Sequence, residues 1–381
     1  SKNIIVKDDL AIVNIDSNQF TDLFKTVQNN AEKLNNKLKD LDPKADDAKV
    51  TVTLDLGKQD AKNAQIPIKS DLVQKAKDSG IDALAIKVNG VSLAADVDQF
   101  KVNTTLNIEK KETKAATDVT KLKVASDVYN FEFIEAGGNP VTFTKPVTIK
   151  LPIANITNIN TDILTLAKII NGKLEFYGGK YNTAGKYFQS SRKSFSTYVI
   201  VENNVNFNDI SSVQDWAGKF IAIAASKGIV QGRGEGKFAP NEQVTRAEFA
   251  TMIVNAFQLE DKSASHSFTD VNNKDWFKSV VASAVKAGII NGRTKSEFAP
   301  NEFITRAEMA TIASRALKLV NGYKDVEDMK AALAKFNDSA SINTSLTSGV
   351  ALAASQGIIV GFNNNFNPNE SSTRAQAAVV I

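Results

Sequence analysis

The chain has 381 residues, of which 43% are hydrophobic and 23% charged, a composition typical of folded domains. Its length predicts two or three domains, and a formal charge of +4 is too small to indicate a nucleic-acid-binding protein. There is no cysteine and a single histidine, His266, which excludes disulfides, thiolate zinc sites and multi-histidine metal sites. We therefore expect no metal and no cofactor.

No apolar run reaches the roughly 18 residues of a membrane helix, so we expect no membrane span. No signal peptide is recognisable at Ser1. This pattern is expected either of a cytoplasmic protein or of a processed piece of a larger exported one.

The first 205 residues are rich in short alternating segments. Residues 18–40 predict a helix with Phe24 and Val27 on its apolar face. The segments 50–56 and 101–110 alternate as strands do, and Asn-Gly at 89–90 predicts a hairpin turn. A polar stretch at 111–120 divides this region. We predict an α+β subdomain over residues 1–115 and a β-sandwich-like subdomain over 116–205.

An internal repeat fills the rest of the chain. In the first copy, Pro240 follows Gly228 by twelve residues and Arg246 follows it by eighteen. The second copy keeps these offsets from Gly288, whereas the third, counted from Gly357, is one residue shorter. The repeats are predicted to span residues 206–262, 263–322 and 323–381, with an extra short helix in the third.

Each copy predicts a helix, a loop and a second helix. The second helix begins with a capping box, in which a Thr at the N-cap is followed three residues later by Glu or Gln. The pairs are Thr245 with Glu248, Thr305 with Glu308, and Thr373 with Gln376. One helical hairpin cannot bury its apolar face alone, but three copies can if they stack or surround an axis.

These motifs resemble the S-layer homology domain, present as a tandem triplet over about 175 residues. The resemblance rests on the F-x-D opening, the Trp before the first helix, and the motifs G-I-x-x-G, F-x-P-N and T-R-A-E. It implies an all-α, pseudo-threefold unit that binds an anionic, often pyruvylated, secondary cell-wall polysaccharide in grooves between repeats. The implied location is the Gram-positive cell surface, with other S-layer subunits as possible partners. The strands before the triplet more weakly resemble modules of such surface proteins.

Arginines stand at the first position of all three capped helices: Arg246, Arg306 and Arg374. A guanidinium beside the free N–H groups of a helix N-terminus can bind a carboxylate or phosphate, and we expect it to face outward. The alternative is an arginine that pairs with a carboxylate and holds neighbouring repeats together. With the resemblance taken into account, we favour ligand contact.

Other residues recur at fixed places in the copies. The two tryptophans could stack on sugar rings or pack in the core, and an Asp in each F-x-D turn could bind sugar hydroxyls or cap the turn. The third copy lacks the Trp and the loop Arg and stops at Ile381, the equivalent of Ile253, so its site is in doubt. The predicted polysaccharide-binding residues are Asp209, Trp216, Arg233, Arg246, Asp270, Trp276, Arg293, Arg306 and Arg374.

Two alternatives to a non-catalytic anchor remain open. Residues 1–205 could form a glycan hydrolase, which needs only two carboxylates, although this region has no tryptophan for a sugar platform. The chain could also be a structural lattice protein. A cleft with paired carboxylates in 1–205 would favour the enzyme.

Overall fold

A computed structural model describes residues 4–153 and 157–381. The chain divides into two compact units, Ser1–Asn203 and Asn204–Ile381. Strands from the ranges 1–115 and 116–205 belong to the same two sheets of the first unit. The predicted boundary near residue 115 therefore does not separate two subdomains, because strand pairing joins the segments on either side of it.

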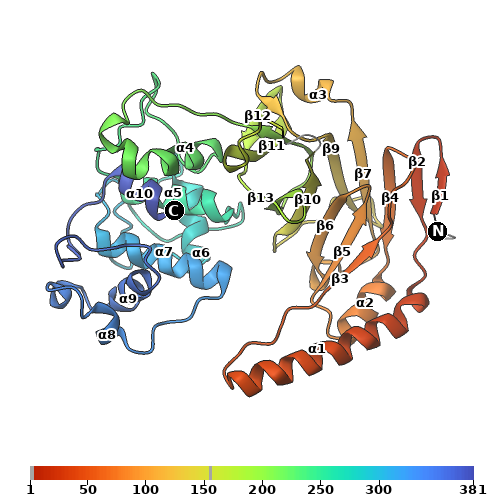
Figure 1. Ribbon diagram of the computed structural model, residues 1–381, viewed down its shortest axis with the longest axis horizontal. Coiled ribbons are helices and arrows are strands. Elements are labelled where there is room, and N and C mark those ends of the chain that lie inside the picture. Colours follow the sequence, from red (N-terminus) through yellow and green to blue (C-terminus); the bar gives the residue numbers. More distant parts are fainter. Residues whose placement is uncertain (1–3, 154–156) are drawn as a thin grey trace. The chain divides into compact units, whose positions relative to one another are not determined.

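The first sheet of the N-terminal unit has the order β1-β2-β4-β7-β9-β15-β11-β12, with β8 also paired to β15. Its strands β9, β7, β4, β2 and β1 follow one another from left to right in Figure 1. Its neighbours are antiparallel except for the parallel pair β2 and β4. The strands are β1 (Ile4–Lys7), β2 (Leu10–Val13), β4 (Asn63–Ile68), β7 (Thr104–Lys111), β8 (Lys123–Val124), β9 (Val128–Glu135), β11 (Leu164–Ile170), β12 (Lys173–Phe176) and β15 (Thr197–Glu202).

The second sheet has the order β13-β14-β10-β6-β5-β3. Residues 89–90 form the predicted tight turn between β5 and β6, with positive φ at both Asn89 and Gly90. The strands are β3 (Thr51–Asp55), β5 (Ala83–Val88), β6 (Val91–Asp96), β10 (Val147–Pro152), β13 (Lys180–Asn182) and β14 (Tyr187–Arg192).

Alternation of apolar and polar residues places one face of each sheet in a shared core. In β4 the buried residues are Ala64, Ile66 and Ile68, and in β10 they are Val147, Ile149 and Leu151. The helices of this unit are α1 (Thr21–Leu41), α2 (Ser70–Asp78) and α3 (Lys114–Thr117), with short 3-10 turns η1 (Ser17–Phe20), η2 (Val97–Gln99) and η3 (Thr161–Ile163). The prediction of a β-rich N-terminal region is confirmed.

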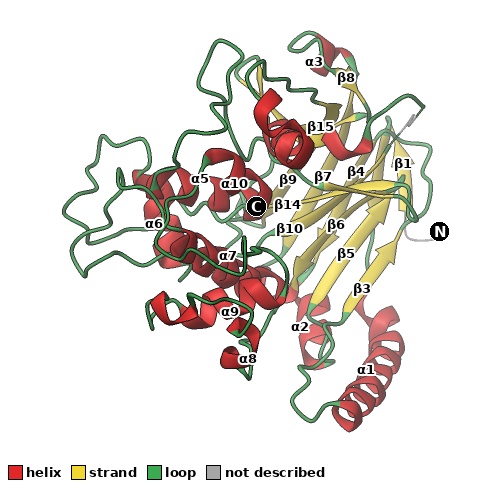
Figure 2. Ribbon diagram, turned by 60° about the vertical axis from the view of Figure 1, so that its left-hand side comes forward, coloured by secondary structure: helices red, strands yellow, loops and turns green. Residues whose placement is uncertain are grey.

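The C-terminal unit consists of helices joined by long loops (Figure 2). All three predicted capping boxes are present, with both reciprocal hydrogen bonds in each. The helices are α4 (Lys219–Ser226), α5 (Arg246–Phe257), α6 (Lys278–Lys286), α7 (Arg306–Asn321), α8 (Met329–Leu333), α9 (Thr347–Ser355) and α10 (Arg374–Val380). The turns η4 (Ser211–Val213), η5 (Gln214–Gly218) and η6 (Ser339–Ser341) complete the unit, and α8 is the predicted extra helix.

The prediction of an all-α C-terminal unit is wrong, because β-bridges connect its repeats. The bridges join Gln243 to Thr373, Thr245 to Phe303, and Thr305 to Ser371. At their centre, the N–H of Ile304 donates to the carbonyl of Val244, that of Ser372 to Ile304, and that of Val244 to Ser372, each at 3.0 Å. The loop before each capped helix must satisfy its own backbone groups, and it does so by pairing with the other repeats.

Helices from different repeats lie against each other. The second helix of one repeat contacts the first helix of the next: α5 with α6, α7 with α9, and α10 with α4. The last pair returns from the third repeat to the first, so the three repeats close into a ring. Residues from at least two repeats therefore line each junction between neighbouring repeats.

Candidate functional site

A cavity of about 490 Å³ lies where the three repeats meet around α7. We call it the repeat-2 groove, because the second repeat contributes most of its wall. One side comes from Arg246 of the first repeat and another from residues before α9 of the third. It is lined by Arg246, Ile290, Asn291, Gly292, Arg293, Glu308, Thr311, Ile312, Arg315, Asn343, Ser345 and Leu346.

Arg246 forms the floor of this groove and is 4% exposed. Its Nε donates to the carbonyl of Phe298 at 2.9 Å and its Nη2 to the carbonyl of Asn291 at 3.1 Å. Its Nη1 lies 2.8 Å from Glu308 Oε1. Burial lowers the pKa of Arg246, and the charge of Glu308 acts in the opposite direction. The expectation that this arginine faces outward is wrong, because it holds the first repeat to the second.

The other two capped helices repeat this contact around the ring. Arg374 is 3% exposed and donates to the carbonyls of Phe238 at 2.9 Å and Gln231 at 2.7 Å. Arg306 donates in the same way to Phe366 at 2.9 Å and Val360 at 3.1 Å. Each arginine therefore bonds to the loop of the next repeat, and the third repeat bonds back to the first.

The loop arginines complete a charge network at two of the three junctions between repeats. Arg293 Nε lies 3.3 Å from Glu308, and Arg233 Nη1 lies 2.5 Å from Glu248. Glu308 and Glu248 are thus shared between a buried arginine and a loop arginine, because Arg374 Nη1 also approaches Glu248 at 3.8 Å. These loop arginines are about 40% exposed, so they remain accessible to a ligand.

The third repeat changes both members of this network. Phe362 replaces the loop arginine and Gln376 replaces the glutamate. Outside the undescribed residues 1–3 and 154–156, no carboxylate forms an ion pair with Arg306. Burial lowers the pKa of this arginine, offset in part by the charges of Glu370 and Asp338. Of the three helix-start arginines, Arg306 is thus the one whose positive charge is least balanced by a nearby carboxylate.

The two tryptophans lie outside the core. Trp216 is 47% exposed and Trp276 is 64% exposed. Trp276 occupies the repeat position that Ser345 takes in the repeat-2 groove, and it precedes α6, which contacts α5. Trp216 lies in η5, which contacts α10. Each tryptophan therefore lies in or next to an element that packs against a capped helix other than α7.

The aspartates of the F-x-D turns are engaged by the backbone. Asp209 accepts hydrogen bonds from the N–H groups of Phe238 and Ala239, both at 2.8 Å. Asp270 accepts from Phe298 at 2.9 Å and Ala299 at 2.7 Å. Burial raises the pKa of Asp209, but the backbone donors outweigh it and the net shift is downward. Both carboxylates fix the loop conformation.

Sequence reasoning missed Arg315, Thr311, Asn343 and Ser345, which all line the repeat-2 groove. A signal was present for two of them: Thr311 and Arg315 follow Glu308 by three and seven residues, which places all three on one helix face. Arg315 is half-buried, and its Nη1 lies 3.4 Å from the carbonyl of Ile289. This groove therefore contains three arginines and one glutamate.

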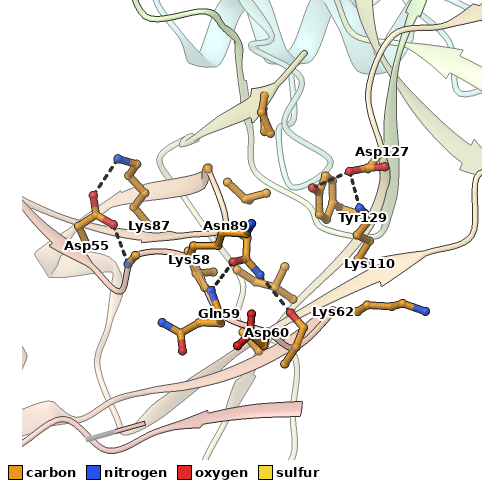
Figure 3. A pocket seen from close by; sticks show the side chains of 18 of the residues that line it. Asp55, Lys58, Gln59, Asp60, Lys62, Lys87, Asn89, Lys110, Asp127 and Tyr129 are labelled. Atoms are coloured by element: carbon orange, nitrogen blue, oxygen red, sulfur yellow. Dashed lines mark hydrogen bonds and ion pairs between the residues drawn. The ribbon is translucent and has the colours of Figure 1, made fainter. Parts of the chain in front are cut away.

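A second cavity, of about 780 Å³, lies in the N-terminal unit where strands β3, β5 and β9 end or begin (Figure 3). Three of its four aspartates lie near lysines: Asp55 is 2.7 Å from Lys87, Asp127 is 2.7 Å from Lys110, and Asp9 is 3.9 Å from Lys62. The hydrogen bond from Lys87 lowers the pKa of Asp55. A glycosidase needs a general acid whose pKa is raised, and Asp55 is shifted the other way.

Three segments of the chain match the model of the S-layer homology domain, at residues 206–250, 267–310 and 335–378. They coincide with the ring of repeats and its arginine network. The chain is therefore a protein with three S-layer homology domains, and it belongs at the cell wall, where such domains anchor surface proteins. No helix within 4–153 and 157–381 is long and apolar enough to cross a membrane.

Relatives include both enzymes and S-layer proteins. An amylopullulanase of Thermoanaerobacterium thermosulfurigenes is 33% identical over 91% of this chain, and the exoglucanase XynX of Acetivibrio thermocellus is 40% identical over 48%. The surface-layer 125 kDa protein of Lysinibacillus sphaericus is 32% identical over 53%. The chain spans 18%, 16% and 17% of these relatives, so it corresponds to a small part of each.

Proposed function

We propose that the C-terminal unit anchors the chain by binding an anionic secondary cell-wall polysaccharide in the grooves between its repeats. The observation that carries this proposal is the repeat-2 groove, where Arg246, Arg293 and Arg315 face a single glutamate, Glu308. A groove with net positive charge favours a carboxylate or phosphate on the polymer, including a pyruvate ketal.

The roles of the nine predicted residues differ within this proposal. Arg233 and Arg293 are accessible and would contact the anion, with Arg315 as an additional contact. Trp216 and Trp276 would stack on sugar rings at the groove borders. Arg246, Arg374 and Arg306 would mainly hold the repeats together, with Arg306 also available to an anion. Asp209 and Asp270 belong to the scaffold.

The grooves are not equivalent in this proposal. Counting only the charged residues that line the cavity, the repeat-2 groove has a formal charge of +2, from three arginines and Glu308. The equivalent residues at the first repeat, Arg374, Arg233 and Glu248, sum to +1, and at the third repeat Arg306 alone gives +1. These sums leave out Glu302 and Glu242, which lie 3.9 Å from Arg293 and 3.3 Å from Arg233. We expect the repeat-2 groove to contribute most to anion binding.

We further propose that the chain is non-catalytic. Several relatives are named as glycan-degrading enzymes, but each is several times longer than the part that matches. The ion pairs of Asp55 and Asp127 in the N-terminal cavity support a structural role for these two carboxylates.

The test is a pull-down of the purified chain with isolated cell-wall sacculi. Binding should be retained on intact walls and lost after chemical removal of the secondary polymer, with a smaller loss when only the pyruvate ketal is removed. Equal binding to bare peptidoglycan would refute the proposal.

A further inference from the structure

The N-terminal cavity, with a volume of about 780 Å³, lies within one compact unit and is walled by both of its sheets. The first sheet contributes Ile108 of β7 and Tyr129 of β9, and the second contributes the β5–β6 hairpin around Asn89. Residues 57–62, in the loop between β3 and β4, form a third wall (Figure 3). Pockets for drug-sized ligands have volumes of about 300–1,000 Å³, so this cavity has room for a ligand of that size.

The inner surface of the cavity is aliphatic. Val88, Val91 and Ile108 belong to the core of the unit and line the cavity from both sheets. Tyr129 also lines it, but it is only 4% exposed, and its ring stacks on Phe131 with 6.0 Å between the ring centroids. Residues 1–205 contain no tryptophan. This surface therefore suits an aliphatic group of a ligand better than the face of a sugar ring.

Asn89 fixes the loop that forms the third wall. Its Oδ1 accepts a hydrogen bond from the N–H of Gln59 at 2.7 Å, and its Nδ2 donates to the carbonyl of Ala61 at 3.1 Å (Figure 3). Its own N–H donates to the carbonyl of Gly57 at 3.1 Å. One residue of the β5–β6 turn thus holds three residues of the loop. The wall keeps its shape without a ligand, so binding costs little ordering of the protein.

The rim of the cavity carries four lysines and four aspartates, so its formal charge is zero. Six of these residues lie in the three Asp–Lys contacts described above. The other two, Lys58 and Asp60, are exposed, and neither forms an ion pair or a side-chain hydrogen bond with any residue of 4–153 or 157–381. They are two residues apart, so their Cα atoms are separated by at most about 7 Å. The loop therefore presents one unpaired cation and one unpaired anion close together.

We propose that the N-terminal cavity binds a short zwitterionic peptide with an aliphatic side chain. The ammonium group of the peptide faces Asp60 and its carboxylate faces Lys58, so each forms a charge-assisted hydrogen bond. The aliphatic side chain lies on Val88, Val91 and Ile108, where its burial adds to the affinity. The neutral rim distinguishes this cavity from the repeat-2 groove, whose charge of +2 favours an anionic polymer.

The test is saturation-transfer NMR on the whole 381-residue chain, with the dipeptide Ala-Leu as the probe. Ala-Leu should bind, and either N-acetylation or C-terminal amidation should raise its Kd by about tenfold or more, because each removes one charge-assisted hydrogen bond. Gly-Gly carries both charges without an aliphatic side chain and should bind more weakly than Ala-Leu. No saturation transfer to Ala-Leu, or equal Kd values for its free and blocked forms, would overturn the proposal. Binding of maltotriose but not of Ala-Leu would overturn it in favour of a sugar site.

Two variants test which residue meets which end of the peptide. Lys58→Gln should abolish the difference in Kd between free and amidated Ala-Leu, and Asp60→Asn the difference between free and acetylated Ala-Leu. The matched controls Lys101→Gln and Asp118→Asn remove the same charges from exposed residues outside the cavity and should leave both differences unchanged.

Lys58 and Asp60 are exposed, so thermal unfolding should show their variants folded. If both variants keep the full differences in Kd, the peptide binds elsewhere and the assignment of this cavity is wrong. None of these measurements uses cell walls, so their failure is separate from a failure of anchoring.

Discussion

Equivalent arginines contact the loops of the second and third repeats, Arg246 and Arg306 respectively, but their electrostatic surroundings differ. Arg246, which contacts the second repeat, forms an ion pair with Glu308, and Glu308 is also bound by Arg293. Arg306, which contacts the third repeat, keeps its two bonds to backbone carbonyls but meets Gln376 and Phe362 in place of the charged pair. Glutamate and loop arginine are lost together, so this exchange by itself leaves the formal charge unchanged but removes ionic bonds; the additional positive charge of the repeat-2 groove comes from Arg315. The comparison indicates that the backbone contacts of the arginine are the constant element and the charge network is an addition.

The largest expected effect is the loss of Arg246. Arg246→Ala removes three contacts between repeats and leaves the largely buried carboxylate of Glu308 without its closest partner. Breaking a buried ion pair in this way costs about 3–5 kcal/mol. Thermal unfolding should show a large fall in Tm. The control is Arg306→Ala, which leaves no carboxylate unpaired and should cost less.

Equal destabilisation by Arg246→Ala and Arg306→Ala would show that the backbone contacts alone carry the stability. Arg306→Ala should still lower the Tm, since Arg306 bonds to Phe366 and Val360 across the repeat boundary. A Tm unchanged by Arg306→Ala would instead show that Arg306 contributes little to the ring.

The second prediction introduces the loop arginine and the glutamate of the second repeat into the third repeat, by Phe362→Arg and Gln376→Glu. Phe362→Arg alone brings a second cation near Arg306 and should destabilise the chain. Gln376→Glu alone should be neutral or stabilising, because it supplies a partner for Arg306. Together they should recover the arrangement of Arg293 and Glu308, with a coupling energy of about 0.5–3 kcal/mol in a double-mutant cycle. Additive effects would mean that the third-repeat loop cannot adopt the geometry of the second.

Substitutions at equivalent positions of two grooves should differ more in their effect on wall binding than in their effect on Tm. Arg315→Ala removes a cation from the repeat-2 groove without breaking an ion pair and should weaken binding to intact walls by about tenfold, since a charge-assisted hydrogen bond contributes about 1.5–3 kcal/mol. The control is Asn255→Ala, at the same repeat position in the first repeat. A binding isotherm with sacculi and a Tm for each variant separate the two effects. Equal losses for both variants would contradict a dominant repeat-2 groove.

Much of the C-terminal unit was predictable because its signals are local. The capping boxes depend on neighbouring residues and are confirmed. Gly228, Gly288 and Gly357 all take the left-handed conformation at the same place in their repeats. The direction of Arg246 was not predictable, because its partners Asn291, Phe298 and Glu308 lie 45 to 62 residues away. The β-bridges were missed for the same reason. In the N-terminal unit the strands were recognisable, but their order, such as β15 between β9 and β11, depends on distant pairing.

The smallest expected effect concerns the aspartates that all three repeats share. Asp209 accepts two backbone hydrogen bonds that lower its pKa below the usual value near 3.9 despite its burial. A group whose pKa is lower in the folded state contributes stability above the unfolded pKa and loses it as pH falls through the folded pKa. Tm should therefore fall below about pH 4. Asp209→Asn keeps one acceptor oxygen but cannot titrate, so it should lower Tm at pH 7 and reduce the fall between pH 4 and pH 2. An unchanged pH dependence in this variant would mean that other carboxylates dominate acid unfolding. The turn of the first repeat would then be no more pH-sensitive than the rest of the ring.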